Sequence, residues 1–349
     1  MAAAEQIKGV PVMGGGPIPK LIVRIGVILV VVTASVAALK MPLGGPRAGR
    51  SPVILRLAEA LPESNPVTVA MRKFAGLVKA KTAGKVIVKL YSSAQLGQEP
   101  EAIEQVRLGI IDMTRINAVA LANVSPSVGV FTLPYIFRNN THKYKVLDGA
   151  VGDEVRADLQ QVGLLGFDFL EAGSRSFYTR SRIIRKLDDL RGLKIRVQPS
   201  RITIRMIELL GAVPTPMNFG EVYSSLSTGV VDGAENDYVS YYTSGHYEVA
   251  PYYTEDNHLS PPAILIMNRA KFTALPAAYQ EAIRQAAHES ALFERKFMSE
   301  SNRQAKIKVA QAGVTITAID NTPFREAVKP IYKEYRAYSQ LITQIEQTE

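Results

Sequence analysis

The chain alternates short apolar runs with amphipathic stretches, as expected where strands and helices follow one another. The run VILRLA at 53–58 predicts a buried strand, and apolar positions from Val67 to Val78 recur at three- and four-residue spacing, which predicts a helix on a sheet. The first expected elements are, in order, a strand at 53–58, a helix at 67–81, a strand at 85–91, a helix from Pro100 to Gly109 and a strand at 110–116. This order with short loops predicts a largely parallel sheet covered by helices.

The middle of the chain repeats the pattern. Residues 193–197 alternate apolar and basic side chains and predict a strand, after which Ser200 is expected to cap a helix that ends before Gly211. A short helix at 221–228 is expected to end at Gly229, with another strand beginning at 230–231. These elements predict a second, smaller α/β lobe.

The late region predicts an unusually long helix. No Gly or Pro occurs between Pro276 and Gly313, and an unbroken helix of that length would extend about 55 Å. Two interpretations stay open on the pattern alone. The stretch forms either one helix along both lobes or two helices that separate near 299–302.

The N-terminus predicts export from the cytoplasm. Lys20 and Arg24 precede the apolar run 25–39, which is short for a membrane span and typical of a secretory signal. We expect residues 1–39 to be a cleaved signal peptide, with an uncleaved anchor extended through 21–23 as the alternative. Both place the folded part outside the cytoplasm, and the lack of Cys argues against a lipoprotein, so a soluble periplasmic protein is expected.

Composition excludes several classes of chemistry. The chain has no Cys, and its four His are never at metal-ligand spacing, so neither a metal nor a cofactor is expected. No nucleophile elbow, P-loop or dinucleotide fingerprint occurs in a suitable context. The acids of 232–237 suggest a calcium loop, but Asp237 stands where that loop needs Gly. We therefore predict that the protein is not an enzyme.

The charge pattern favours a small anionic ligand. The chain has 41 Lys and Arg against 32 Asp and Glu, a formal net charge of +9, without a basic block. Dispersed charge does not predict a nucleic-acid partner. Arg175 and Arg196 are the candidate anion-binding residues, because a guanidinium pairs bidentately with a carboxylate.

Several motifs in a fixed order carry a family resemblance. The segments DLRGLKIRVQPS, GAVPTPMNFGEVY and GVVDGAEN begin at residues 189, 211 and 229, and LGQE, LGIIDM and LPYIF precede them at 96, 108 and 133. Together they closely resemble the solute-binding proteins of tripartite ATP-independent periplasmic (TRAP) transporters. The resemblance extends from about Leu55 to Tyr335.

The resemblance implies a two-lobed α/β periplasmic-binding-protein fold, with a ligand cleft between the lobes and one long helix spanning both. It implies an organic-acid carrier, expected to be a monomer, that delivers its ligand to the TRAP membrane subunits. On this basis the lobes are expected at 51–172 with 261–300 (lobe I) and at 173–260 with 301–349 (lobe II).

Matched residue by residue, the resemblance implies a ligand site. Arg196 corresponds to the arginine that clamps the ligand carboxylate, and Arg175 to a second arginine that supports or contacts the same anion. Asn236 corresponds to an asparagine near the carboxylate and Phe219 to an aromatic against the ligand body. The polar positions facing the other end of the ligand are Glu99 and Asn117.

Each assignment has a structural alternative. Phe219 would also suit the core of the second lobe, Glu99 would also suit a helix start, and Asn236 would also suit a cap or turn. Arg115 and Glu59, near the ends of first-lobe strands, are weaker candidates.

The ligand expected from the resemblance is a hexuronate or related sugar acid. The segments 113–117, 175–178 and 235–241 look most like those of family members that bind such acids. Polar residues also offer partners for hydroxyls, and leaving them buried without a partner costs about 1–3 kcal/mol each. The alternatives are a C4-dicarboxylate, with Arg115 on its distal charge, and a periplasmic enzyme that acts on a sugar acid.

Overall fold

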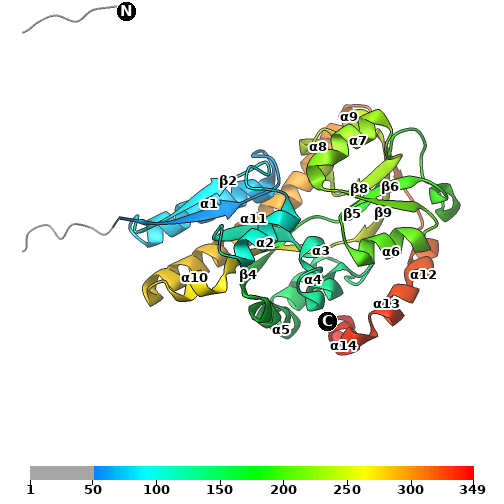
Figure 1. Cartoon of the computed structure of the whole chain (residues 1–349). Helices are drawn as coiled ribbons and strands as arrows, with labels where there is room; N and C mark the ends of the chain where they lie inside the picture. Colours follow the sequence, from blue (N-terminus) through cyan, green and yellow to red (C-terminus); the bar gives the residue numbers. More distant parts are fainter. Residues whose placement is uncertain (1–50) are drawn as a thin grey trace, which may run out of the picture. The chain divides into compact units, whose positions relative to one another are not determined.

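The computed structural model describes residues 51–349, which form two mixed β-sheets flanked by helices (Figure 1). The predicted signal peptide at 1–39 lies outside the described residues. We call each sheet with the helices that cover it a lobe, the first lobe containing the N-terminal strand. The predicted two-lobed α/β class is confirmed.

The first sheet joins strands from three parts of the chain. In spatial order it contains β2 (Val86–Tyr91), β1 (Val53–Ala58), β3 (Met113–Asn117), β10 (Pro262–Asn268) and β4 (Leu164–Glu171). The first three run parallel, as predicted, whereas β10 pairs antiparallel with both of its neighbours. The sheet is therefore mixed.

Both faces of the first sheet are covered by apolar helix faces. Leu55 and Leu57 of β1 pack with α1 (Pro66–Lys81) and α11 (Ala277–Gln311), whereas Ala58 packs in the cluster that contains Ile103 and Val106 of α2 (Glu99–Arg107). Asn65 caps α1 through its side chain, which accepts from the Val67 amide. The amphipathic spacing read from the sequence is thus the spacing that buries α1.

The second sheet is also covered by helices on both faces. Its spatial order is β11 (Thr315–Ala318), β9 (Tyr252–Leu259), β5 (Arg175–Thr179), β8 (Gly233–Asn236), β6 (Lys194–Val197) and β7 (Val213–Pro216). Phe177 and Tyr178 are adjacent on β5 and fall in different core clusters, one with α6 (Arg201–Leu209) and one with α7 (Val222–Thr228). These helices lie on opposite sides of the sheet in Figure 1.

Three local predictions need correction. The expected strand at 110–116 begins at Met113, because the backbone amides of residues 110 and 111 bond back to Gln105. The strand expected from 230 begins at Gly233, because the Val231 amide bonds back to α7. Ser200 precedes α6 as predicted, but its side chain makes no capping hydrogen bond.

The late region forms one unbroken helix. Helix α11 extends over 35 residues. It contacts α1 and β4 of the first lobe and α8 (Tyr238–Thr243) of the second lobe, so the interpretation as a single spanning helix is correct (Figure 1). No helix within residues 51–349 is long and apolar enough to cross a membrane.

The chain passes between the sheets three times: after β4, after β9, and through α11 before β11. The C-terminal helices α12 (Thr322–Val328) and α13 (Pro330–Glu334) contact α6, whereas α14 (Ser339–Gln347) contacts α5 (Ala150–Asp158) of the first lobe. The lobe boundaries given above stay a prediction.

Candidate functional site

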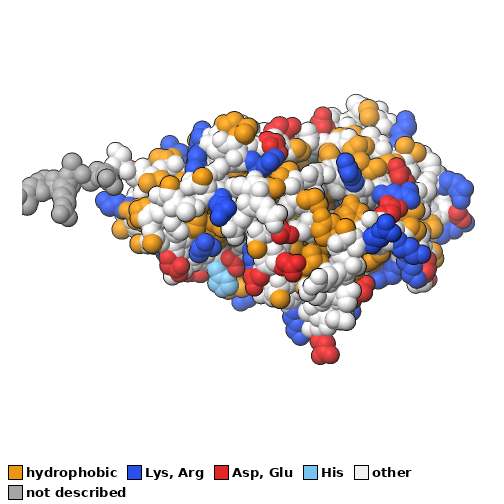
Figure 2. Space-filling model, turned by 60° about the horizontal axis from the view of Figure 1, so that its bottom comes forward, with side chains coloured by type: hydrophobic (Ala, Val, Ile, Leu, Met, Phe, Trp, Pro, Cys, Tyr) orange, Lys and Arg blue, Asp and Glu red, His pale blue; other side chains and the backbone are white. Residues whose placement is uncertain are grey.

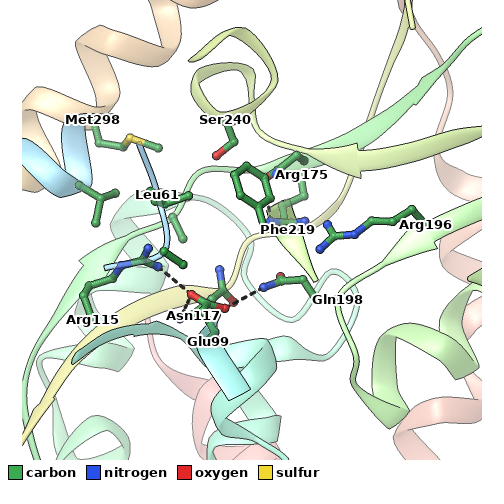
Figure 3. A pocket seen from close by; sticks show the side chains of 14 residues that line it. Leu61, Glu99, Arg115, Asn117, Arg175, Arg196, Gln198, Phe219, Ser240 and Met298 are labelled. Atoms are coloured by element: carbon green, nitrogen blue, oxygen red, sulfur yellow. Dashed lines mark hydrogen bonds and ion pairs between the residues drawn. The ribbon is translucent and has the colours of Figure 1, made fainter. Parts of the chain in front are cut away.

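The ends of strands from both sheets meet around one cavity. Parallel strands bring their carboxyl ends to the same edge of a sheet, where ligands of α/β proteins gather. β3 ends there at Asn117, and β8 ends there at Asn236. The cavity is lined by Ala60, Leu61, Val67, Glu99, Arg115, Asn117, Ala172, Arg175, Arg196, Gln198, Phe219, Asn236, Ser240 and Met298. The structure therefore brings together all six predicted site residues, five of which are labelled in Figure 3.

Arg196 is a buried cation without a paired anion in the described chain. Its Nε and Nη2 donate to the Met217 carbonyl at 3.1 and 2.9 Å. Nη1 is buried and has no hydrogen-bond partner within residues 51–349, and no carboxylate of that range forms an ion pair with Arg196. Burial lowers the pKa of Arg196 to about 10. One edge of the guanidinium is thus anchored to backbone, and the other is open to an anion.

Arg175 is committed to protein partners instead. Nη2 donates to Glu235 Oε1 at 2.8 Å, and Nη1 donates to Asn236 Oδ1 at 2.7 Å. Burial favours the neutral acid, but Arg175 and His258 hold the pKa of Glu235 at about 2. Arg175 therefore carries a compensated charge and orients Asn236, which points to support of the site rather than to a second open clamp.

The arginine on the first-lobe side of the cavity is also paired with acids of the protein. Arg115 forms an ion pair with Glu59 and donates from Nη1 to Glu99 Oε1 at 3.0 Å. Although burial alone would lower the pKa of Arg115, the Glu59 and Glu99 carboxylates raise it. Burial raises the pKa of Glu99 against the opposing effect of Arg115. Arg115 is consequently not a free cation for a second ligand carboxylate.

Three of these residues also have a structural alternative, and their contacts extend beyond that alternative. Glu99 is the first residue of α2, yet its carboxylate accepts from Arg115 and from the Asn117 backbone amide rather than capping its own helix. Asp237, not Asn236, caps α8 through its side chain. Phe219 is half-buried and lines the cavity, and the centre of its ring lies 6.0 Å from the Arg196 guanidinium carbon.

The acids of 232–237 act separately rather than as a calcium loop. Asp232 accepts from the Lys194 amide, Glu235 pairs with Arg175, and Asp237 accepts from the amides of residues 239 and 240. Within the part of the chain that the structure describes, no three His, Asp or Glu side chains are placed to hold a metal ion.

Some residues that line the cavity, or that contact its lining residues, were not singled out from the sequence. Gln198 lies two residues beyond Arg196, so strand alternation was the signal that would have directed both side chains to one face. Glu235 directly precedes Asn236 in the GAEN motif, and only the pairing of β8 with β5 reveals its contact with Arg175. Leu61 and Met298 are brought in by tertiary packing, which no local pattern encodes.

The cavity is closed by contacts between the lobes. Gln198, which follows β6, donates to Glu99 of α2 at 3.2 Å, and Asn123 Nδ2 donates to the Pro199 carbonyl at 2.6 Å. The three arginines and Asn236 are all buried. The two lobes therefore contact each other directly beside the cavity.

Charged side chains elsewhere are interspersed. Figure 2 shows acidic and basic residues mixed over the face that it presents, with apolar side chains among them. The dispersed charge read from the sequence has its counterpart on that face.

Comparison with known proteins places this geometry in a family. The sequence model of the DctP family, described as bacterial extracellular solute-binding protein, family 7, matches residues 57–338. A solute-binding protein of Chromohalobacter salexigens is 38% identical over 275 residues, which is 78% of this chain and 82% of that protein.

Solved structures give the same result for the fold. A TRAP periplasmic solute-binding protein from Xanthobacter autotrophicus Py2 with bound β-D-galacturonate has a TM-score of 0.83 at 38% identity, covering 84% of this chain and 100% of its own. A second, from Roseobacter denitrificans with bound β-D-glucuronate, has a TM-score of 0.83 at 37% identity, covering 85% of this chain and 100% of its own.

Proposed function

The chain belongs to the bacterial extracellular solute-binding proteins of family 7, the DctP family of TRAP solute-binding proteins, and we propose that it captures a hexuronate or related sugar acid. It acts outside the cytoplasm and delivers the acid to a TRAP membrane permease. Bound galacturonate and glucuronate in two similar structures support this ligand class.

The observation that carries the ligand class is which of the arginines that line the cavity have a carboxylate partner. Arg115 is paired with Glu59 and Glu99, and Arg175 with Glu235, so Arg196 is the lining arginine that has no carboxylate partner within residues 51–349 and that an anionic ligand would pair with. A buried charge without a partner is unfavourable in free energy, and one ligand carboxylate would compensate it. The site accordingly favours a ligand with a single negative charge.

The remaining cavity surface suits a polyhydroxy body. Asn236 and Asn117 use their carbonyl oxygens on Arg175 and the Val119 amide, which leaves their amide nitrogens as donors for hydroxyl oxygens. The half-buried ring of Phe219 offers an apolar face for the C–H face of a sugar ring. Residues Arg196, Arg175, Asn236, Phe219, Glu99 and Asn117 are therefore our proposed ligand-binding set.

The same pairing of charges argues against a C4-dicarboxylate. Its second carboxylate would approach Glu99 in a buried cavity, where repulsion between like charges is strong. Arg115, the cation expected to serve that charge, is already paired with two acids.

We further propose that the protein is a binding protein without catalysis. Ser240 is the one hydroxyl side chain among the lining residues of the described chain, and these residues include no histidine to act as its base. Incubation of the full chain with D-glucuronate followed by mass analysis is expected to return the ligand unchanged.

A thermal-melting screen tests the ligand class. D-glucuronate and D-galacturonate at a hundred times the dissociation constant should stabilise the full chain by about 2.7 kcal/mol, a rise of several degrees. Succinate, malate and fumarate should leave the melting temperature unchanged. Stabilisation by these dicarboxylates and by no uronate would refute the sugar-acid assignment but leave the family unaffected.

A further inference from the structure

Gln198 connects the two lobes inside the cavity. It follows β6 two residues after Arg196, and its Nε2 donates to Glu99 Oε2 at 3.2 Å across the cleft (Figure 3). Glu99 Oε1 is used separately, by Arg115 and by the Asn117 amide. Gln198 therefore completes the hydrogen bonds of a first-lobe carboxylate from the second lobe.

This contact fixes the orientation of the Gln198 amide. Because a carboxylate that accepts from Arg115 and Asn117 presents a further acceptor, the NH₂ group must face Glu99 and the carbonyl oxygen must face the other way. That oxygen, Oε1, is buried and has no hydrogen-bond partner within residues 51–349. It lines the cavity with Arg196, whose Nη1 is the matching unpartnered donor.

The two unpartnered atoms require complementary hydrogen-bonding groups on a ligand. Arg196 Nη1 needs an acceptor, which a carboxylate supplies, and Gln198 Oε1 needs a donor, which a hydroxyl supplies. Buried polar atoms are normally paired, so both unpartnered atoms in one cavity point to a ligand that bears the two groups.

We propose that Gln198 determines ligand specificity by accepting a hydrogen bond from one ligand hydroxyl while its amide nitrogen holds Glu99 across the cleft. The inference deepens the proposed function and rests on it. Since the Glu99 contact exists only when the lobes meet, hydroxyl recognition and closure depend on the same side chain. An acid without that hydroxyl leaves Oε1 buried and unpaired in the closed state.

The test compares hydroxyl preferences in matched variants. Gln198→Met keeps the length of the side chain and removes both polar atoms, and Gln198→Ala serves as a second variant. Asn123→Ala is the control, because Asn123 makes another hydrogen bond between the lobes, to the Pro199 carbonyl, without lining the ligand cavity. Calorimetry on the full chain measures affinity for D-glucuronate and for its 2-, 3- and 4-deoxy analogues.

In the wild type at least one deoxy analogue should bind about tenfold more weakly than D-glucuronate, the effect of leaving a buried acceptor unpaired. In Gln198→Met that analogue and D-glucuronate should bind within threefold of each other. Asn123→Ala should keep the tenfold difference while weakening all four ligands equally. If every difference persists in both Gln198 variants, the specificity role is wrong while the proposed function stands.

A second ligand pair separates the two levels of inference. If no uronate binds but L-malate binds more tightly than succinate, and Gln198→Met abolishes that preference, the role of Gln198 holds and the uronate assignment fails. If no uronate binds and the wild type binds L-malate and succinate equally, both the uronate assignment and the role of Gln198 are wrong.

Discussion

Replacing Arg196 with methionine should abolish ligand binding without destabilising the ligand-free protein. Arg196 is 1% exposed and has no carboxylate partner in residues 51–349. Methionine fills a similar volume without a charge, and replacing a buried charge by an apolar side chain is often neutral or stabilising.

The magnitude follows from two opposing effects. Burial lowers the pKa of Arg196 to about 10, which corresponds to about 3 kcal/mol of unfavourable free energy for the charged form. Against this, the Met217 carbonyl loses its donors, at roughly 1–3 kcal/mol. The free energy of unfolding of Arg196→Met should therefore lie between the wild-type value and about 2 kcal/mol above it.

Arg175→Met provides a matched comparison. Arg175 is 3% exposed, but its removal takes the bidentate partner from Glu235 and leaves this buried acid with His258, at 3.6 Å, as its remaining ion-pair partner. Breaking a buried ion pair in this way typically costs about 3–5 kcal/mol. The same substitution at two equally buried arginines should thus have opposite effects on stability.

Urea unfolding of both variants and calorimetry with D-glucuronate provide the measurements. Arg196→Met should unfold at or above the wild-type midpoint and show no binding, whereas Arg175→Met should unfold well below it. If the two variants are destabilised equally, Arg196 is not an unpaired charge awaiting a ligand, and the reasoning fails.

Three further predictions concern proton binding, charge and closure. Burial raises the pKa of Glu294 to about 8, so the folded state retains a proton that the unfolded state releases, and stability should fall from about pH 4.3 to 8. Glu294→Gln should flatten the dependence of the melting temperature on pH over that interval, and an unchanged profile would contradict this. Glu99→Gln should weaken D-glucuronate binding about tenfold by removing a charged acceptor, yet strengthen succinate binding, so a loss for both ligands in calorimetry would count against repulsion by Glu99. Small-angle scattering should give a smaller radius of gyration with D-glucuronate than without it, whereas an equal radius would indicate a rigid, closed site.

The elements that the sequence predicts well are those set by local patterns. Helix α1 and strands β1 and β2 follow from apolar spacing, and α11 follows from a long stretch without Gly or Pro. The starts of β3 and β8 were placed too early, because apolar residues such as Val231 are held in the turn by backbone hydrogen bonds to the preceding helix. Apolarity alone does not distinguish such a turn from a strand.

The site residues likewise include some that motifs in the sequence indicate and some contacts that only tertiary structure determines. The family motifs point to Arg175 and Arg196, but two arginines look alike in a sequence. Their difference arises from the pairing of β5 with β8, which sets Glu235 against Arg175 and leaves Arg196 without an acid. The Glu99–Gln198 contact joins residues 99 positions apart across two lobes, and no local pattern encodes it.

In the proposed function the cavity takes one negative charge together with hydroxyls. Calorimetric titration of the full chain with D-gluconate and D-glucarate tests it directly, because these open-chain acids differ only in a terminal hydroxymethyl group or carboxylate. We expect D-gluconate to bind at least about tenfold more tightly than D-glucarate, since the second carboxylate of D-glucarate would face Glu99 without a free cation. Equal or tighter binding of D-glucarate would contradict it.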